Sequence, residues 1–157
     1  MTATQKVRTC LWFNSQGEEA ARFYVSLLPD SRIETVSRPN TNGPALTVDF
    51  TLAGAPYQAL NGGPMYPQTP AASIAVVTKD QAETDTLWAA LVADGGEAGQ
   101  CGWLTDRFGV SWQIVPERLL EMLGAPDRAA AARANDAMLQ MGKIDVAALE
   151  AAFRGES

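Results

Sequence analysis

Residues 6–28, KVRTCLWFNSQGEEAARFYVSLL, predict a β-strand that leads directly into an α-helix. Between residues 6 and 14 the side chains alternate, which gives a strand two distinct faces. One face carries Val7, Thr9, Leu11 and Phe13, and the other carries Arg8, Cys10 and Trp12. Ser15 and Glu18 fit the capping box that begins a helix, and apolar residues then recur at helical spacing up to Pro29. The stretch therefore predicts a β-α unit.

Three more strands are predicted to complete this unit. Their residues alternate between apolar and polar over 32–38, 45–52 and 56–60, and turn-forming residues separate them. The first module, residues 5–63, is therefore expected to run β-α-β-β-β.

The same order of elements is expected a second time, after a Gly- and Pro-rich linker over residues 61–70. A strand is predicted over 73–78, and Asp80 with Glu83 marks the start of a helix that ends at Gly95. Short strands over 99–104 and 110–115 follow, with a turn at 106–109. Placing Ser15 on Asp80 aligns the two copies with an offset of 65 residues. The second module is expected over residues 71–116.

Residues 117–155 are rich in Ala, Leu, Met and Glu and predict a tail of three helices, over 117–123, 127–141 and 145–153. The apolar side chains of this tail are expected to pack on the body of the protein or on a second subunit. Exposed sheet edges and the apolar surface of the tail together favour a homodimer. The fold class is thus α+β: two tandem β-α-β-β-β modules with a helical tail, in a single domain over residues 1–157.

The charge balance argues against nucleic acid and membrane partners. The 157 residues carry 12 Lys and Arg against 18 Asp and Glu, a net charge of −6, with no basic cluster for a phosphate backbone. The first 15 residues have no apolar signal-peptide core, and no run approaches the roughly 18 apolar residues of a spanning helix. Two cysteines 91 residues apart form no disulfide framework. We expect a cytoplasmic protein with both thiols reduced.

The sequence contains no histidine, which excludes every mechanism and every metal site that depends on imidazole. Two cysteines are too few for a thiolate zinc cage.

Several local motifs resemble the PhnB-like branch of the vicinal oxygen chelate superfamily, often labelled 3-demethylubiquinone 3-methyltransferases. They are TCLWF at 9–13, EEAARFY at 18–24, ALNGGP at 59–64, CGWL at 101–104, DRFGVSWQIVP at 106–116 and AMLQMGKID at 137–145. The superfamily includes glyoxalases, extradiol dioxygenases and bleomycin-binding proteins. The resemblance implies that each module forms half of a cup around a small molecule, commonly in a dimer.

The methyltransferase label is not supported by the residues. A site for S-adenosylmethionine usually has a Gly-rich turn between a strand and a helix in a doubly wound sheet. Gly62 and Gly63 are followed by Pro64 and an irregular stretch that starts no helix.

The resemblance also indicates where metal-using relatives hold their ligands: near the start of the first strand and on the last strand of each module. In this chain those positions are expected to be Arg8, Ala59, Ser73 and Gln113. One cation, one methyl group and two weak neutral oxygen donors cannot bind a divalent metal with useful affinity. We therefore expect no metal and no cofactor.

The cup implied by the resemblance would be lined by a mixed set of side chains. The ligand-binding candidates are Arg8, Cys10, Trp12, Asn61, Ser73 and Gln113, joined by Ala59, Ala75, Val77 and Ser111, with Trp103 and Arg107 at the rim. Such a lining suits a planar aromatic or anionic metabolite that stacks on Trp12 and pairs with Arg8. Alternatively, Arg8 extends into solvent and Trp12 only fills space.

Two residues are weighed for catalysis. Arg8 could lower the pKa of the Cys10 thiol and so activate it as a nucleophile, although an inert cysteine is more common. Asp49 could act as a general base, because an acid within a strand is unusual. With no visible acid and base pair, we predict a metal-independent small-molecule-binding protein. A metal-independent enzyme on a small metabolite is the alternative, and turnover of excess ligand distinguishes the two.

Overall fold

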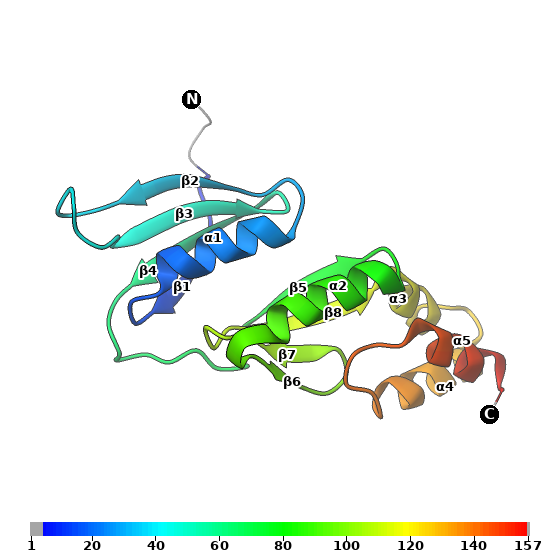
Figure 1. The fold of residues 1–157 in the computed structure, drawn as a ribbon. Helices are drawn as coiled ribbons and strands as arrows, with labels where there is room; N and C mark the ends of the chain where they lie inside the picture. Colours follow the sequence, from blue (N-terminus) through cyan, green and yellow to red (C-terminus); the bar gives the residue numbers. More distant parts are fainter. Residues whose placement is uncertain (1–4, 157) are drawn as a thin grey trace. The chain divides into compact units, whose positions relative to one another are not determined.

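The computed structural model describes residues 5–156, so the ends of the predicted single domain, residues 1–4 and 157, lie outside the described residues (Figure 1). The chain divides between Gln68 and Thr69 into two compact units. Each unit contains one β-α-β-β-β module with its own four-stranded mixed sheet, and the second also holds the helical tail. The α+β class and the duplication are therefore confirmed.

The first unit forms a sheet with strand order β1-β4-β3-β2, in which β1 runs parallel to β4 and the other neighbours are antiparallel. Its elements are β1 (Thr9–Phe13), α1 (Gly17–Leu27), β2 (Arg32–Ser37), β3 (Thr47–Leu52) and β4 (Ala55–Asn61). Helix α1 lies along one face of this sheet (Figure 1). Buried apolar residues from the sheet and the helix form the core there, among them Leu11, Phe13, Tyr24, Val48, Phe50 and Ala59.

Helix α1 does not begin with the predicted capping box. Its N-cap residue is Gln16, which makes no side-chain cap. The Gly17 amide instead donates to Oδ1 of Asn61 at 2.7 Å. The carboxylate of Glu18 binds Arg38 and Arg22, and these hydrogen bonds lower its pKa. Asn61, at the end of β4, thus replaces the predicted Ser15 cap, because the tertiary fold places its side-chain oxygen at the free amides of the first helix turn.

The second unit repeats the topology, with strand order β5-β8-β7-β6 and β5 parallel to β8. Its elements are β5 (Ser73–Thr78), α2 (Gln81–Val92), a 3-10 turn (Ala93–Gly95), β6 (Glu97–Ala98), β7 (Trp103–Thr105) and β8 (Ser111–Pro116). The predicted cap of α2 is confirmed, since the Asp80 carboxylate accepts from the Glu83 amide at 2.9 Å.

The strand predicted over 99–104 is wrong in its position. A turn interrupts it, in which Cys101 and Gly102 have φ of 58° and 83°, and the pairing falls on β6 and β7 on either side. A strand cannot continue through two residues in the left-handed region.

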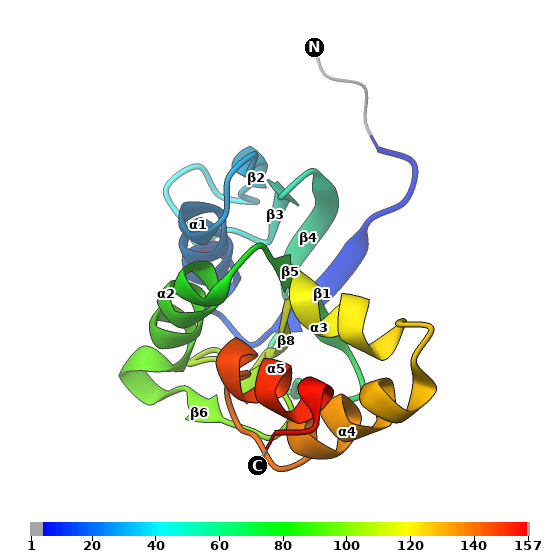
Figure 2. The ribbon, with the colours of Figure 1, turned by 90° about the vertical axis from the view of Figure 1, so that its right-hand side faces the viewer.

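The tail consists of α3 (Glu117–Leu123), α4 (Arg128–Met138) and α5 (Val146–Arg154), which lie together in the second unit (Figure 2). Their buried side chains form a cluster of Leu119, Met122, Ala134, Ile144 and Leu149. Met138 and Met141 pack against this cluster.

The side chain of Gln81, in the first turn of α2, holds the tail to the body. Its Nε2 donates to the Ile144 carbonyl at 3.0 Å, and its Oε1 accepts from the Val146 amide at 2.8 Å. Lys143 also lies 2.7 Å from Asp85. These contacts pack the tail on its own chain, the first of the two arrangements expected from the sequence. Across residues 5–156, no helix combines the length and the apolar character needed to cross a membrane.

Candidate functional site

Three polar side chains meet on the face of the first sheet that lies away from α1. Val48 and Phe50 are buried on the α1 side, so Asp49 between them points to the opposite face. Nη1 of Arg8 lies 2.6 Å from Oδ2 of Asp49, and Nε2 of Gln58 donates to Oδ1 of the same carboxylate at 2.9 Å. Arg8 precedes β1, Gln58 lies on β4 and Asp49 on β3, so three parts of the unit build this Arg8–Asp49–Gln58 cluster.

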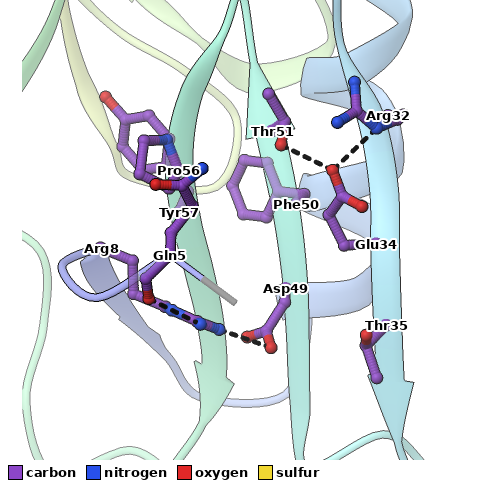
Figure 3. A pocket seen from close by; sticks show the side chains of 10 residues that line it. All are labelled: Gln5, Arg8, Arg32, Glu34, Thr35, Asp49, Phe50, Thr51, Pro56 and Tyr57. Atoms are coloured by element: carbon purple, nitrogen blue, oxygen red, sulfur yellow. Dashed lines mark hydrogen bonds and ion pairs between the residues drawn. The ribbon is translucent and has the colours of Figure 1, made fainter. Parts of the chain in front are cut away.

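A cavity of about 270 Å³ opens beside this cluster (Figure 3). On its other side Arg32 lies 2.8 Å from Glu34, and the Thr51 hydroxyl donates to the same Glu34 oxygen at 2.8 Å. Figure 3 shows these two ion pairs as separate groups along the cavity lining. Its volume is just below the roughly 300–1,000 Å³ typical of small-molecule sites. The cavity thus suits a small metabolite.

Aromatic residues complete the lining. Phe50 and Tyr57 stack with ring centroids 5.4 Å apart and planes 17° from parallel. Burial raises the pKa of the Tyr57 hydroxyl, so that group stays a neutral donor at physiological pH. The charged and hydroxyl side chains therefore face the cavity, while the stacked rings of Phe50 and Tyr57 lie on the α1 side of the sheet.

Cys10 is not an activated nucleophile. The residue is exposed overall, but partial burial of its sulfur and then the negative charge of Asp49 raise the pKa of the thiol. The expectation that Arg8 lowers this pKa is wrong, because the Arg8 guanidinium is ion-paired with Asp49.

Trp12 lies between the buried Leu11 and Phe13 and so occupies the face away from α1, as predicted. Its indole Nε1 donates to the Gly63 carbonyl at 2.9 Å, and the Tyr66 ring meets it edge to face with centroids 5.0 Å apart. A Cβ on Gly62 would lie only 2.2 Å from the indole ring. The loop after β4 therefore folds closely against Trp12.

The prediction that Ala59 and Asn61 share the face of Arg8 and Trp12 is wrong. Ala59 is paired with Leu11 in the β1–β4 register and is buried on the α1 side. Asn61 lies on the same side, where it caps α1 and donates through Nδ2 to the Ala45 carbonyl at 3.1 Å. Both polar atoms of the Asn61 side chain therefore bind the backbone of the first unit.

The face prediction holds in the second unit. Ile114 is fully buried, which places Gln113 on the face away from α2. There Nε2 of Gln113 donates to the Ser73 hydroxyl at 2.9 Å, and Trp103 is its neighbour in the β7–β8 register. The structure thus brings Ser73, Trp103 and Gln113 together. Arg107 lies elsewhere, over the Phe108 ring at 4.8 Å and 3.9 Å from Asp94.

Gln58 is the site residue that the sequence interpretation missed. It pairs with Cys10 just as Gln113 pairs with Ala75, and the 65-residue offset places Cys10 on Ala75. The two glutamines therefore hold equivalent places in the two modules. Applying the second module's register to the first would have selected Gln58 over Ala59.

The sequence matches a known family over most of its length. A model of the 3-demethylubiquinone-9 3-methyltransferase family matches residues 5–115. The chain belongs to this family. The match ends before α3, so the helical tail lies outside it. No curated protein matches the sequence.

Solved structures show the same fold. The PhnB protein of Bacillus cereus is 32% identical with a TM-score of 0.65, over 71% of this chain and 99% of that one. Protein PA1353 of Pseudomonas aeruginosa is 23% identical with a TM-score of 0.59, over 73% and 98%. The fosfomycin resistance protein FosX of Listeria monocytogenes is 16% identical with a TM-score of 0.56, over 80% and 100%, and shows the fold alone. This PhnB-like chain therefore has the glyoxalase/bleomycin resistance fold.

The residues of this PhnB-like chain do not fit the metal site of metal-using relatives. The corrected register puts Gln58 in place of Ala59, which adds a neutral oxygen donor. The Arg8 guanidinium, however, already binds the nearby Asp49 carboxylate, so a cation stands where a metal would need its negative ligand. Among residues 5–156, no group of three or more Cys, Asp or Glu side chains could hold a metal ion.

The residues also do not fit the methyl donor that the family name implies. The chain leaves β4 through Gly62 and Gly63 and reaches β5 with no helix in between. Packing against Trp12, rather than the approach of a cofactor, explains why residue 62 is glycine.

Proposed function

We propose that this PhnB-like protein is a metal-independent small-molecule-binding protein whose ligand contacts Arg8 in the cavity of the first unit. The observation that carries the proposal is a guanidinium at the edge of a cavity of about 270 Å³. Nη1 of Arg8 binds Asp49, and its Nη2 donates to the Gln5 carbonyl at 3.3 Å. A guanidinium has five N–H donors, so these two contacts leave donors for a ligand.

The chemistry of the lining favours a planar or anionic metabolite. An anionic group on a ligand would form charge-assisted hydrogen bonds with Arg8, the strongest kind of polar contact in such a site. Phe50 and Tyr57 also border the cavity, but their stacked rings lie on the α1 side of the sheet. Trp12 shares the face but already packs against the 62–66 loop, so pairing with Arg8 is the principal contact and stacking on Trp12 is secondary.

Binding is favoured over catalysis. The raised pKa of Cys10 argues against a thiolate nucleophile, and the Asp49 carboxylate is held by Arg8 and Gln58, which argues against a general base.

We further propose that residues 1–157 act as one domain and that the protein is a cytoplasmic homodimer. Ser73, Trp103 and Gln113 are proposed to contribute to ligand binding. Two free thiols, Cys10 and Cys101, support the location.

A panel of aromatic carboxylates, titrated against intrinsic tryptophan fluorescence and by calorimetry, tests the proposal. We expect hits whose affinity falls roughly tenfold to a hundredfold in Arg8→Gln, the cost of one charge-assisted contact. Arg22→Gln is the matched control, because Arg22 is an exposed arginine on α1. The Trp12→Phe variant shows whether Trp12 reports the binding.

Two results would overturn the proposal. One is an unchanged affinity of every hit in Arg8→Gln. The other is depletion of an excess of ligand during incubation, which would identify an enzyme.

A further inference from the structure

The charges around the cavity come in opposite pairs. Arg8 with Asp49 forms one pair and Arg32 with Glu34 forms the other. The Arg8 and Asp49 side chains are only 23% and 27% exposed, so their charges are partly shielded from water. The four groups sum to no net charge. Each pair thus offers a positive partner for an anionic group and a negative partner for a cationic group.

Such a lining favours a ligand that carries both charges over a ligand that carries only one. An anion that contacts Arg8 also comes close to the Asp49 carboxylate, because the two groups are 2.6 Å apart. A cation that contacts Asp49 is repelled by Arg8 in the same way. Like charges within about 4–6 Å oppose each other appreciably in a partly buried site.

The Asp49 carboxylate is held in a fixed orientation. Arg8 binds one oxygen and Gln58 donates to the other. Each carboxylate oxygen has two lone pairs, so both can still accept a further donor. The cluster therefore presents a positive and a negative group side by side, each with unused hydrogen-bonding capacity.

We propose, resting on the function proposed above, that the ligand is a small zwitterion of the α-amino acid class, with its carboxylate on Arg8 and its ammonium on Asp49. The two charges of an α-amino acid are carried by one carbon, which matches the adjacency of Arg8 and Asp49. The cavity of about 270 Å³ then has room for the side chain.

A set of matched compounds tests the charge requirement by calorimetry on the full chain. L-Alanine, L-leucine and L-phenylalanine are each compared with the acid that lacks the amino group and with the amine that lacks the carboxyl group. For phenylalanine these are 3-phenylpropanoate and 2-phenylethylamine. At least one amino acid is expected to bind about tenfold or more tightly than both of its singly charged counterparts, since each lacks one charge-assisted contact.

Two variants assign the contacts. Asp49→Asn should weaken amino acid binding about tenfold or more while strengthening binding of the matched acid, because the repelling carboxylate is gone. Arg8→Gln should weaken both the amino acid and the acid. Arg22→Gln should change neither, and circular dichroism checks that each variant is folded.

The outcomes separate the two proposals. Binding of an acid as tight as that of its amino acid overturns the zwitterion inference and leaves the proposed function standing. Amino acid binding that is unchanged in both Arg8→Gln and Asp49→Asn overturns the placement at this cluster. If no amino acid binds up to its solubility limit, the inference fails, and the aromatic carboxylate panel decides the proposed function independently.

Discussion

Arg8 and Asp49 form an ion pair at 2.6 Å although β4 lies between β1, which Arg8 precedes, and β3, which contains Asp49. Ion pairs that water still reaches contribute only about 0–1 kcal/mol to stability. The pair therefore matters less for the fold than for the cavity beside it, where it fixes a cation and an anion in place. The Arg8 guanidinium also does not fit a metal site in the first module, since it stands where a metal would need a negative ligand.

The purified protein is expected to hold no stoichiometric transition metal, because the one carboxylate of the Arg8–Asp49–Gln58 cluster is paired with Arg8 and Gln58 is an uncharged donor. Elemental analysis after gel filtration measures this directly. Treatment with a chelator should also leave the melting temperature unchanged. Zinc, iron, nickel or manganese near one ion per chain would contradict the prediction.

The Cys10 thiol is expected to react slowly with iodoacetamide, since only the thiolate is nucleophilic and the raised pKa leaves less of it at a given pH. The dependence of its rate on pH should be displaced to higher pH than that of a free thiol. In Asp49→Asn the rate should rise, because a negative charge that raises the pKa is removed. Peptide mapping by mass spectrometry measures the alkylation of Cys10, and Cys101 of the same molecule is the internal control. An unchanged rate of Cys10 alkylation in Asp49→Asn would count against the prediction.

Asp106→Ala is expected to lower the free energy of unfolding by about 3 kcal/mol. The Asp106 carboxylate is 2% exposed and accepts hydrogen bonds from three donors: the amides of Phe108 and Val110 and the indole of Trp112. Denaturant unfolding measures the loss. Asp136→Ala removes an exposed carboxylate from α4 and should change little, so equal losses in the two variants would refute the assignment.

Gln81→Ala is expected to loosen the helical tail and cost about 1–2 kcal/mol, because the Gln81 amide makes two hydrogen bonds to the backbone at residues 144 and 146. Limited proteolysis should cut near residue 144 earlier than in the wild type. Gln140→Ala, which removes an exposed amide from the tail, is the matched control. A proteolysis pattern identical to the wild type would show that apolar packing alone holds the tail.

Light scattering is expected to give twice the mass of one chain. The methionines of the tail pack in the cluster formed by the tail itself, so they do not form the apolar dimer surface that the sequence predicted. Val77, 57% exposed on the face of β5 away from α2, is a better candidate for the contact. Val77→Glu should therefore favour the monomer. Leu139→Glu, at a residue 51% exposed on the tail, should leave the dimer intact. The reverse result would place the contact on the tail, and a wild-type monomer at micromolar concentration would contradict the dimer.

The sequence by itself determined most of the local structure. The strand at 73–78 and the helix at 117–123 were predicted with the bounds that the structure has, and the Asp80 cap was predicted with its partner. Each of these depends on residues within a few positions of one another: alternation along a strand, or a side chain that reaches the first helix turn. The duplication followed from the same local signals.

Tertiary structure alone decided what these elements do to one another. In β4 the small side chain of Ala59 fits either face, and a shift of one residue exchanges every side chain between the two faces of a sheet. The pairing of Ala59 with Leu11 places Ala59 on the α1 side, so Gln58 lies on the face of the cavity. Asn61 then faces α1, where its side chain caps the helix in place of the predicted Ser15. The ion-pair partner of Asp49 could not be predicted from the sequence either, because Arg8 is 41 positions away. The two residues become neighbours only when β1 and β3 pair with opposite edges of β4.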